Sequence, residues 1–231
     1  MMAVLQYVAD LLFPRLCPVC GRALSVGERH VCALCMAELP RTGYHTIDFN
    51  PMEQLFAGKV PVERATGYFF YERGSRHAAI LHAIKYHNQP QMGEWMGRQF
   101  AGEVAQSGFF GDVDAVVPVP MHRGKLARRG YNQSEYIARG ISSVIGCPVE
   151  KVVKAVKGHD TQTHKGRHER LVNMQGVFAL ASAEAITGRH LLLVDDVVTT
   201  GATLLSCAEV LRQAAPDVRI SIATLAVARL Q

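Results

Sequence analysis

The chain has 231 residues, 48% of them hydrophobic and 19% charged, which is enough apolar material for a globular core. Its longest apolar stretches, such as 220–228, fall well short of the roughly 20 residues that a membrane-spanning helix needs, so we expect no membrane insertion. The formal net charge of +5 is unevenly spread, with basic runs at 122–129 and 151–170. Such runs commonly bind nucleic acid or a phosphate-rich small molecule, although a solvated basic face is the alternative for either one.

The N-terminal residues have a helix-like apolar pattern, and four of the six cysteines follow closely in the spacing C-x₂-C-x₁₁-C-x₂-C. Four thiolates in two short knuckles suit tetrahedral Zn²⁺, and four protein ligands leave no open position, so the expected site is structural. Disulfides and a redox-active C-x-x-C motif are the alternatives. No secretory signal precedes the cysteines and no βαβ unit surrounds them, which disfavours both and leads us to expect a cytoplasmic protein. The predicted ligands are Cys17, Cys20, Cys32 and Cys35, without His30.

Beyond a loop-like stretch near 41–61, predicted strands alternate with predicted helices. An aromatic strand at 65–71 precedes a helix over 75–87, with Ser75 in the N-cap position. The alternation continues to the C-terminus and predicts an α/β fold with a mainly parallel sheet flanked by helices. The remaining expected elements are strands at 114–120, 149–156, 176–180, from 191 and at 218–228, and helices at 132–145 and 202–214.

Residues 191–204, LLLVDDVVTTGATL, place two carboxylates at the end of a strand apolar enough to be central. Ligands of parallel sheets bind beyond the carboxyl ends of the strands. Adjacent acids repel each other, so Asp195 and Asp196 should face sugar hydroxyls, a metal ion or both, and contribute little to the core. Residues 199–203 then open a helix whose free N–H groups suit a phosphate. The stretch predicts a ribose 5-phosphate pocket; the alternative is a solvated Asp pair followed by a Thr helix cap.

The pattern DD-x-x-TTG-x-T resembles the 5-phosphoribosyl-1-pyrophosphate (PRPP) signature of type I phosphoribosyltransferases. The whole chain resembles the competence protein F (ComF) family, which joins that domain to N-terminal cysteines. The resemblance implies an N-terminal helix and zinc ribbon over 1–45, a hood or connecting segment over 46–110 and a phosphoribosyltransferase-like core over 111–231. The other matching pieces are 84–86 (IKY), 116–120 (VVPVP), 128–134 (RRGYNQS), 161–163, Arg170, Asn173 and 176–178.

The resemblance also implies roles for individual residues. Asp195 and Asp196 would bind the ribose hydroxyls directly or through Mg²⁺, and arginines would hold the pyrophosphate, for which their planar fork is suited. The basic loop 157–170 corresponds to the family's mobile loop, which we expect to close over the leaving group. The implied catalytic residues are Asp195, Asp196, Arg167 and Arg170. The implied phosphate-binding residues are Val198, Thr199, Thr200, Gly201, Ala202 and Thr203, and the implied pyrophosphate-binding residues are Arg123, Arg128, Arg129, Gly130 and Lys165.

Three functions stay open at this level. The first is a phosphoribosyltransferase that joins ribose 5-phosphate to an acceptor, and the second is a protein of DNA uptake or use that senses PRPP or a nucleotide while handling single-stranded DNA. The third is a partner or regulatory protein without turnover, which the complete DD-x-x-TTG-x-T pattern disfavours. The expected partners are therefore PRPP or another ribose 5-phosphate ligand, with single-stranded DNA or competence proteins under the second function. No residue of the hood segment identifies the acceptor.

Overall fold

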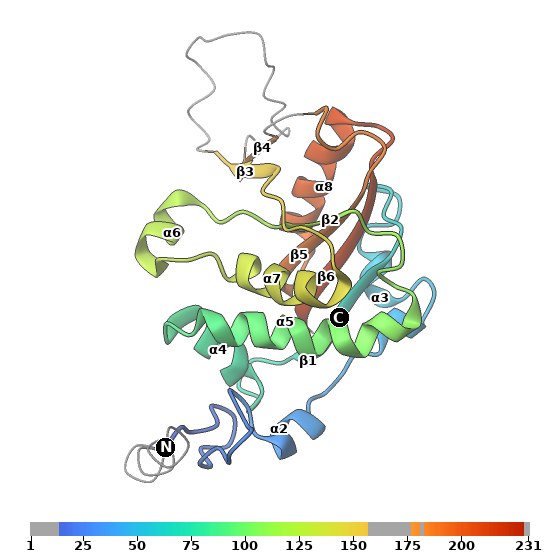
Figure 1. Ribbon diagram of the computed structural model, residues 1–231. Coiled ribbons are helices and arrows are strands. Elements are labelled where there is room, and N and C mark those ends of the chain that lie inside the picture. The colour runs from blue at the N-terminus through green and yellow to red at the C-terminus, as the bar shows by residue number, and fades with distance from the viewer. Residues whose placement is uncertain (1–13, 157–176, 181–182, 229–231) are drawn as a thin grey trace.

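A computed structural model describes residues 14–156, 177–180 and 183–228 (Figure 1). Its centre is a four-stranded parallel sheet in the order β1-β6-β5-β2, as the alternation of strands and helices predicts. Because β5 lies between two strands and its first five residues are buried, the two acids near its carboxyl end stand at the centre of the sheet. The strands are β1 (Ala65–Tyr71), β2 (Ala115–Pro118), β5 (His190–Val198) and β6 (Arg219–Ala228).

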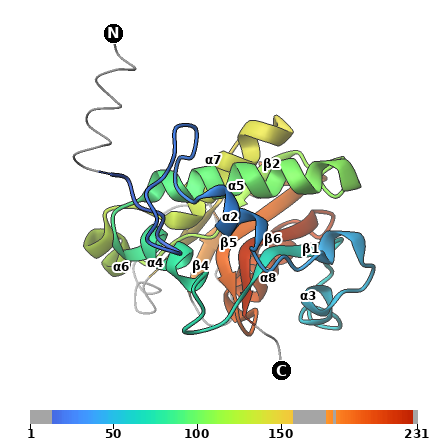
Figure 2. The same ribbon diagram turned by 90° about the horizontal axis from the view of Figure 1, so that it is seen from below.

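Helices cover both faces of this sheet (Figure 2). Leu192 and Val194 of β5 face the core layer formed with α4, α5 and α7, whereas Leu191 and Leu193 face the layer formed with α3 and α8. The alternation of side chains along β5 thus divides the core in two. The helices are α3 (Pro51–Gln54), α4 (Ala78–Tyr86), α5 (Pro90–Val104), α6 (Arg123–Arg129), α7 (Gln133–Ile145) and α8 (Ala202–Ala214), with 3₁₀ turns at Tyr44–Thr46 and Ala105–Ser107.

Helices α5 and α7 cross with their backbones in close approach. A Cβ atom on Gly97 would lie 2.3 Å from the carbonyl oxygen of Ile137, and one on Gly140 would lie 2.0 Å from that of Glu94. Only glycine fits at either position, since real Cβ contacts of this length do not occur. The crossing holds α7, whose first turn reaches the end of β5, against the helices that follow β1.

Two local predictions differ from the structure. The helix expected over 75–87 begins at Ala78, and its N-cap is His77, without a side-chain capping bond, not Ser75. The stretch near 41–61 is not simply a loop, because Asn50 caps the short helix α3.

The strands expected at 149–156 and 176–180 do not join the main sheet. They form a separate antiparallel pair, β3 (Val153–Ala155) and β4 (Phe178–Leu180), that packs in the layer of α8. Among the described residues of these two stretches, Val149 alone bridges to β2, at Val116. Pairing stops there because Pro118 and Pro120 have no N–H to donate along that edge.

The N-terminal ribbon, with α2 (Ala33–Ala37), packs on the outer side of α4 and α5. Three of its cysteines, Cys17, Cys32 and Cys35, belong to the same buried cluster as Phe100 of α5. Polar contacts join the same parts: Arg76 pairs with Glu38 at 2.6 Å, and Arg41 pairs with Glu103 at 2.8 Å. Within the ranges that the structure describes, no helix combines the length and the apolar character needed to cross a membrane.

Candidate functional site

A cavity of about 460 Å³ opens at the carboxyl end of β5. Residues from α4, from α6 and the turn before it, from the start of α7, and from β4, β5 and α8 line it, so it draws together segments that are far apart in the sequence. This is where parallel sheets bind their ligands. The charged residues of its lining are Lys85, Lys125, Arg128, Arg129, Asp195 and Asp196.

Asp195 is held through one oxygen of its carboxylate. Ser134 Oγ donates to Oδ1 at 2.8 Å, and the backbone N–H of Asp196 donates to the same oxygen at 2.8 Å. Ser134 is in place because Asn132 caps α7 and accepts from its backbone N–H at 3.2 Å. Burial, and then the neighbouring charge of Asp196, raise the pKa of Asp195 to about 7, while the hydrogen bond from Ser134 opposes the shift. Among the described residues none bonds to Oδ2, so this oxygen is open to a ligand.

Asp196 has a different environment from that of Asp195. Its side chain is buried, with 4% of the residue exposed, and its Oδ2 lies 3.1 Å from the ammonium of Lys85 at the end of α4. The expectation that both acids face the surface is therefore wrong for Asp196. The pair is close enough to be an ion pair, yet its geometry leaves the buried Oδ2 without an aligned hydrogen bond. A buried carboxylate oxygen without an aligned hydrogen bond is suited to accept from a further donor or to bind a cation.

The basic wall of the cavity is α6. Arg128 and Arg129 line the cavity as expected for pyrophosphate ligands, and Lys125 joins them. Arg123 is not among the described residues that line the cavity. Gly130 does not line it either but ends α6, with a φ of 81°. The Arg129 guanidinium lies 5.4 Å from the centre of the Tyr86 ring, which is 64% exposed at the cavity rim.

The predicted phosphate loop lies at the start of α8. Gly201 is the N-cap with a φ of 76° and no side-chain capping bond, so the alternative of a threonine cap is not what the structure has. Thr199 and Thr200 are exposed, and Thr203 lines the cavity. The side chain of Val198 is buried in the core, which leaves only its backbone for a ligand. The first N–H groups of α8 point out of the helix end, where an anion is favoured.

Three predicted site residues, Lys165, Arg167 and Arg170, lie outside the described residues, as does the loop 157–170 to which they belong. Conversely, the structure brings Lys85, Tyr86 and Ser134 to the site, although no role was predicted for them from the sequence. Signals for all three were present, since 84–86 and 128–134 are among the pieces that resemble the ComF family.

The four N-terminal cysteines converge as the spacing predicts. The Sγ atoms of Cys17, Cys20, Cys32 and Cys35 all lie within 4.8 Å of one another, and those of Cys20 and Cys32 are 3.7 Å apart. Sulfurs bound to one tetrahedral Zn²⁺ at 2.3 Å would be about 3.8 Å apart, so the cluster fits the metal. Burial opposes ionisation of Cys17, but N–H groups led by that of Cys32 lower its pKa to about 7. The ring of His30 packs 5.8 Å from that of Trp95.

Two family models match this chain. A phosphoribosyl transferase domain covers residues 127–231, which include the whole acidic and phosphate-loop segment, and a double zinc ribbon domain covers residues 8–45. The second match and the cysteine cluster together support a structural zinc site.

Relatives of known name were also found. The chain is 36% identical to Competence protein F of Haemophilus influenzae over 102 residues, which are 43% of this chain and 44% of that protein. It is 26% identical to DNA utilization protein YhgH of Escherichia coli K12 over 217 residues, 87% of this chain and 92% of that protein. The match thus spans less than half of Competence protein F and nearly all of YhgH. Adenine phosphoribosyltransferase from Leishmania tarentolae superposes with a TM-score of 0.38 and 12% identity, over 82% of this chain and 94% of that one.

Proposed function

Because this chain belongs to the ComF family of phosphoribosyltransferase-like proteins with an N-terminal zinc ribbon, we propose that its cavity at the end of β5 binds PRPP. One observation carries the proposal: two carboxylates, a basic helix and the open start of α8 line or border the same cavity. Carboxylates accept from ribose hydroxyls, arginines neutralise a pyrophosphate, and a helix start receives a 5-phosphate.

The acidic pair also fits the Mg²⁺ that would accompany PRPP. Oxygen ligands suit Mg²⁺, and the unbonded Oδ2 of Asp195 and the poorly bonded Oδ2 of Asp196 are such ligands. The ion would neutralise phosphate charge when bound. Lys85 supplies part of the same charge balance from the protein itself, since its ammonium lies 3.1 Å from Asp196.

The residues of the chain would act by holding and neutralising the ligand. Asp195 and Asp196 would fix the ribose, the first turn of α8 would anchor the 5-phosphate, and Arg128 and Arg129 would face the pyrophosphate. These contacts serve recognition of PRPP and transfer of its ribose 5-phosphate equally. Transfer further needs an acceptor that displaces pyrophosphate at the anomeric carbon. The reach-in cations for that step are proposed to be Lys165, Arg167 and Arg170.

Binding of single-stranded DNA is a second candidate function, favoured by one specific observation. Tyr86 is a largely exposed ring beside Arg129 and the other cations of α6, and such rings stack on bases in proteins that bind single strands. Two relatives are named for competence and for DNA utilization, which supports a link of the family to DNA but assigns no DNA contact to this cavity.

The test separates the pyrophosphate contacts from the ribose contacts. We expect the Arg128→Gln, Arg129→Gln double variant to bind PRPP about 100-fold more weakly while binding ribose 5-phosphate almost normally, because only PRPP carries the pyrophosphate. Arg98→Gln is the matched control, since Arg98 is a surface residue of α5 that pairs with Glu94. Wild-type protein that binds neither ligand would refute the proposal. Release of pyrophosphate with a panel of bases, measured on the same samples, distinguishes transfer from recognition.

A further inference from the structure

Phe56 borders the phosphate loop, although it belongs to the segment before β1. A Cβ atom placed on Gly201 would lie 3.4 Å from Cε1 and 3.5 Å from Cζ of Phe56, so the edge of the ring closes the space beside the Gly201 backbone. Phe56 is 1% exposed, and it belongs to the same buried cluster as Val198 and Leu204, which flank the loop on either side. The loop is therefore packed against the hood segment and not only against its own helix.

The loop has few polar contacts that could hold it in place. For the described residues from Thr199 to Gly201, the hydrogen bonds are those from Ala202 N to Thr200 Oγ1, at 3.5 Å, and from Leu205 N to the Gly201 oxygen, at 2.8 Å. Both threonines are exposed. Gly201 has a left-handed backbone conformation, and glycine loses more backbone freedom on folding than other residues do, so this conformation needs support from neighbouring groups. Its position then depends on packing against two side chains, because Cδ1 of Leu55 lies 3.6 Å from the same Cβ position and the ring of Phe56 lies slightly closer.

The segment that carries Phe56 is itself firmly attached to the sheet. The Asn50 side chain caps α3 by accepting from Met52 N at 2.9 Å, and its Nδ2 donates to the Ala65 oxygen, at the start of β1, at 2.9 Å. The carboxylate of Glu53 accepts from the N–H of the same Ala65 at 3.2 Å. Asn50 is 1% exposed, so these bonds are shielded from water. The ring is thus presented to the loop from a fixed position.

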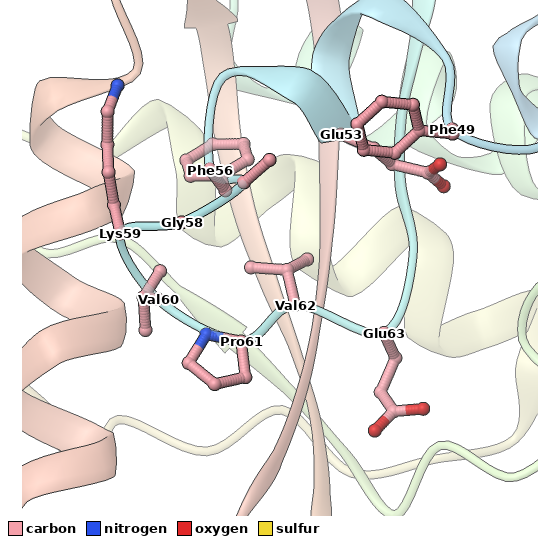
Figure 3. Close-up of a pocket in the computed structure, with 10 residues that line it drawn as sticks. Phe49, Glu53, Phe56, Gly58, Lys59, Val60, Pro61, Val62 and Glu63 are labelled. Atoms are coloured by element: carbon pink, nitrogen blue, oxygen red, sulfur yellow. The ribbon is translucent and has the colours of Figure 1, made fainter.

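Phe56 also borders a second cavity of about 460 Å³ (Figure 3). Val60, Pro61 and Val62 form much of its apolar wall, and Phe49 lies across from them. Because this space is not filled by other side chains, we expect a shortened side chain at position 56 to leave a gap beside the loop. We infer that Phe56 is a positioning residue, whose ring fixes Gly201 and with it the N–H groups proposed to receive the 5-phosphate. The inference rests on the proposed function, since it concerns the same phosphate loop.

The experiment compares two phenylalanines in matched substitutions. Phe56→Leu shortens the side chain beside the loop, and Phe110→Leu makes the same change in the other core layer, just before β2 and away from the carboxyl end of the sheet. Calorimetry with ribose 5-phosphate and urea unfolding are measured on both variants. We expect a comparable loss of stability in the two variants, but a dissociation constant for ribose 5-phosphate that is about tenfold larger in Phe56→Leu alone. If Phe56→Leu does not fold, Phe56→Met replaces it, because methionine keeps most of the volume but not the flat edge.

Equal affinity for ribose 5-phosphate in the wild type and in the Phe56 variant would overturn the inference, as would equal weakening in both leucine variants, which would mark a general effect of lost packing. These outcomes leave the proposed function intact, because the wild type binds in both. Absence of binding of both ribose 5-phosphate and PRPP by the wild type is a different result, which refutes the proposed function and the inference together.

Discussion

Asp195 and Asp196 are neighbours in sequence but do different work in the folded protein. Asp195 is oriented by Ser134 through one carboxylate oxygen and lines the cavity, whereas Asp196 is buried against Lys85. The first is thus placed to bind a ligand directly, and the second also connects β5 to α4. Substituting each acid separately should therefore produce different effects on stability.

Asp196→Asn is expected to destabilise the fold by about 1–3 kcal/mol, because it leaves the partly buried ammonium of Lys85 beside a neutral amide. Urea unfolding measures the change. Adding Lys85→Met should recover part of the loss, since both members of the pair are then neutral. A single variant as stable as the wild type would show that the 3.1 Å ion pair contributes nothing to the fold.

Asp195→Asn should have an effect that depends on pH. The pKa of this carboxyl is raised to about 7 in the folded protein, so the folded state binds its proton more tightly than the unfolded state does. The wild type therefore loses stability from this group as the pH rises from about 4, its ordinary value, to about 7. The variant should gain stability relative to the wild type across that window and match it near pH 4. Unfolding curves at several pH values measure this, and a difference that stays constant with pH would contradict it.

At the scale of elements, the crossing of α5 and α7 holds the start of α7, and with it Ser134, at the end of β5. The close approach of the two helices depends on glycines, which by helix propensity alone would be expected to disfavour a helix. The sequence pattern therefore predicts α7 and α8 but not α5, whose interior contains Gly93, Gly97 and Gly102. Helix propensity is a local property, whereas the need for glycine here comes from a partner helix about forty residues later.

Gly140→Ala tests the crossing. Alanine favours a helix more than glycine does, yet its Cβ would lie 2.0 Å from the carbonyl oxygen of Glu94, so we expect a net loss of about 2 kcal/mol or more in unfolding free energy. Gly102→Ala is the control, because it lies in α5 with no heavy atom within 4 Å of the added Cβ. This control should gain up to about 1 kcal/mol. Equal behaviour of the two variants would mean that the helices are not in close contact.

The candidate site shows the same division between what sequence does and does not reveal. The acidic pair and the phosphate loop are contiguous, so one stretch of sequence predicted both. Lys85 and Ser134 reach the site from two other helices, and Phe56 reaches the loop from the segment before β1. Their proximity to β5 depends on how the layers pack, which no local pattern encodes. The burial of Asp196 was missed for the same reason.

At the scale of the whole molecule, the zinc ribbon is part of the fold and not a loosely attached module. Cys17, Cys32 and Cys35 share a buried cluster with residues of α4 and α5, and Lys85 lies in the last turn of α4. A change in the ribbon can therefore reach the helices that border the cavity. The sheet has its own second core layer, formed with α8, and does not depend on the ribbon in that way.

Metal removal tests this arrangement. The protein should contain about one zinc per chain, and its removal by a chelator should unfold the ribbon, because small zinc sites fold with their metal. Hydrogen exchange should then increase over residues 14–40 and over α5, while β5 and β6 stay protected. A zinc-free protein after purification under reducing conditions would contradict the assignment, and exchange confined to 14–40 would show that the ribbon is independent of α5.

The central claim, that the cavity at the end of β5 is a PRPP site, is tested most directly by calorimetry of PRPP with Mg²⁺ on the wild type and on the Asp195→Asn, Asp196→Asn double variant. Circular dichroism establishes that the variant is folded under the conditions used. We expect one PRPP per chain in the wild type and no measurable binding in the variant, because the ribose hydroxyls and the ion lose their carboxylates together. PRPP affinity that is unchanged in the folded variant would contradict the assignment of this cavity.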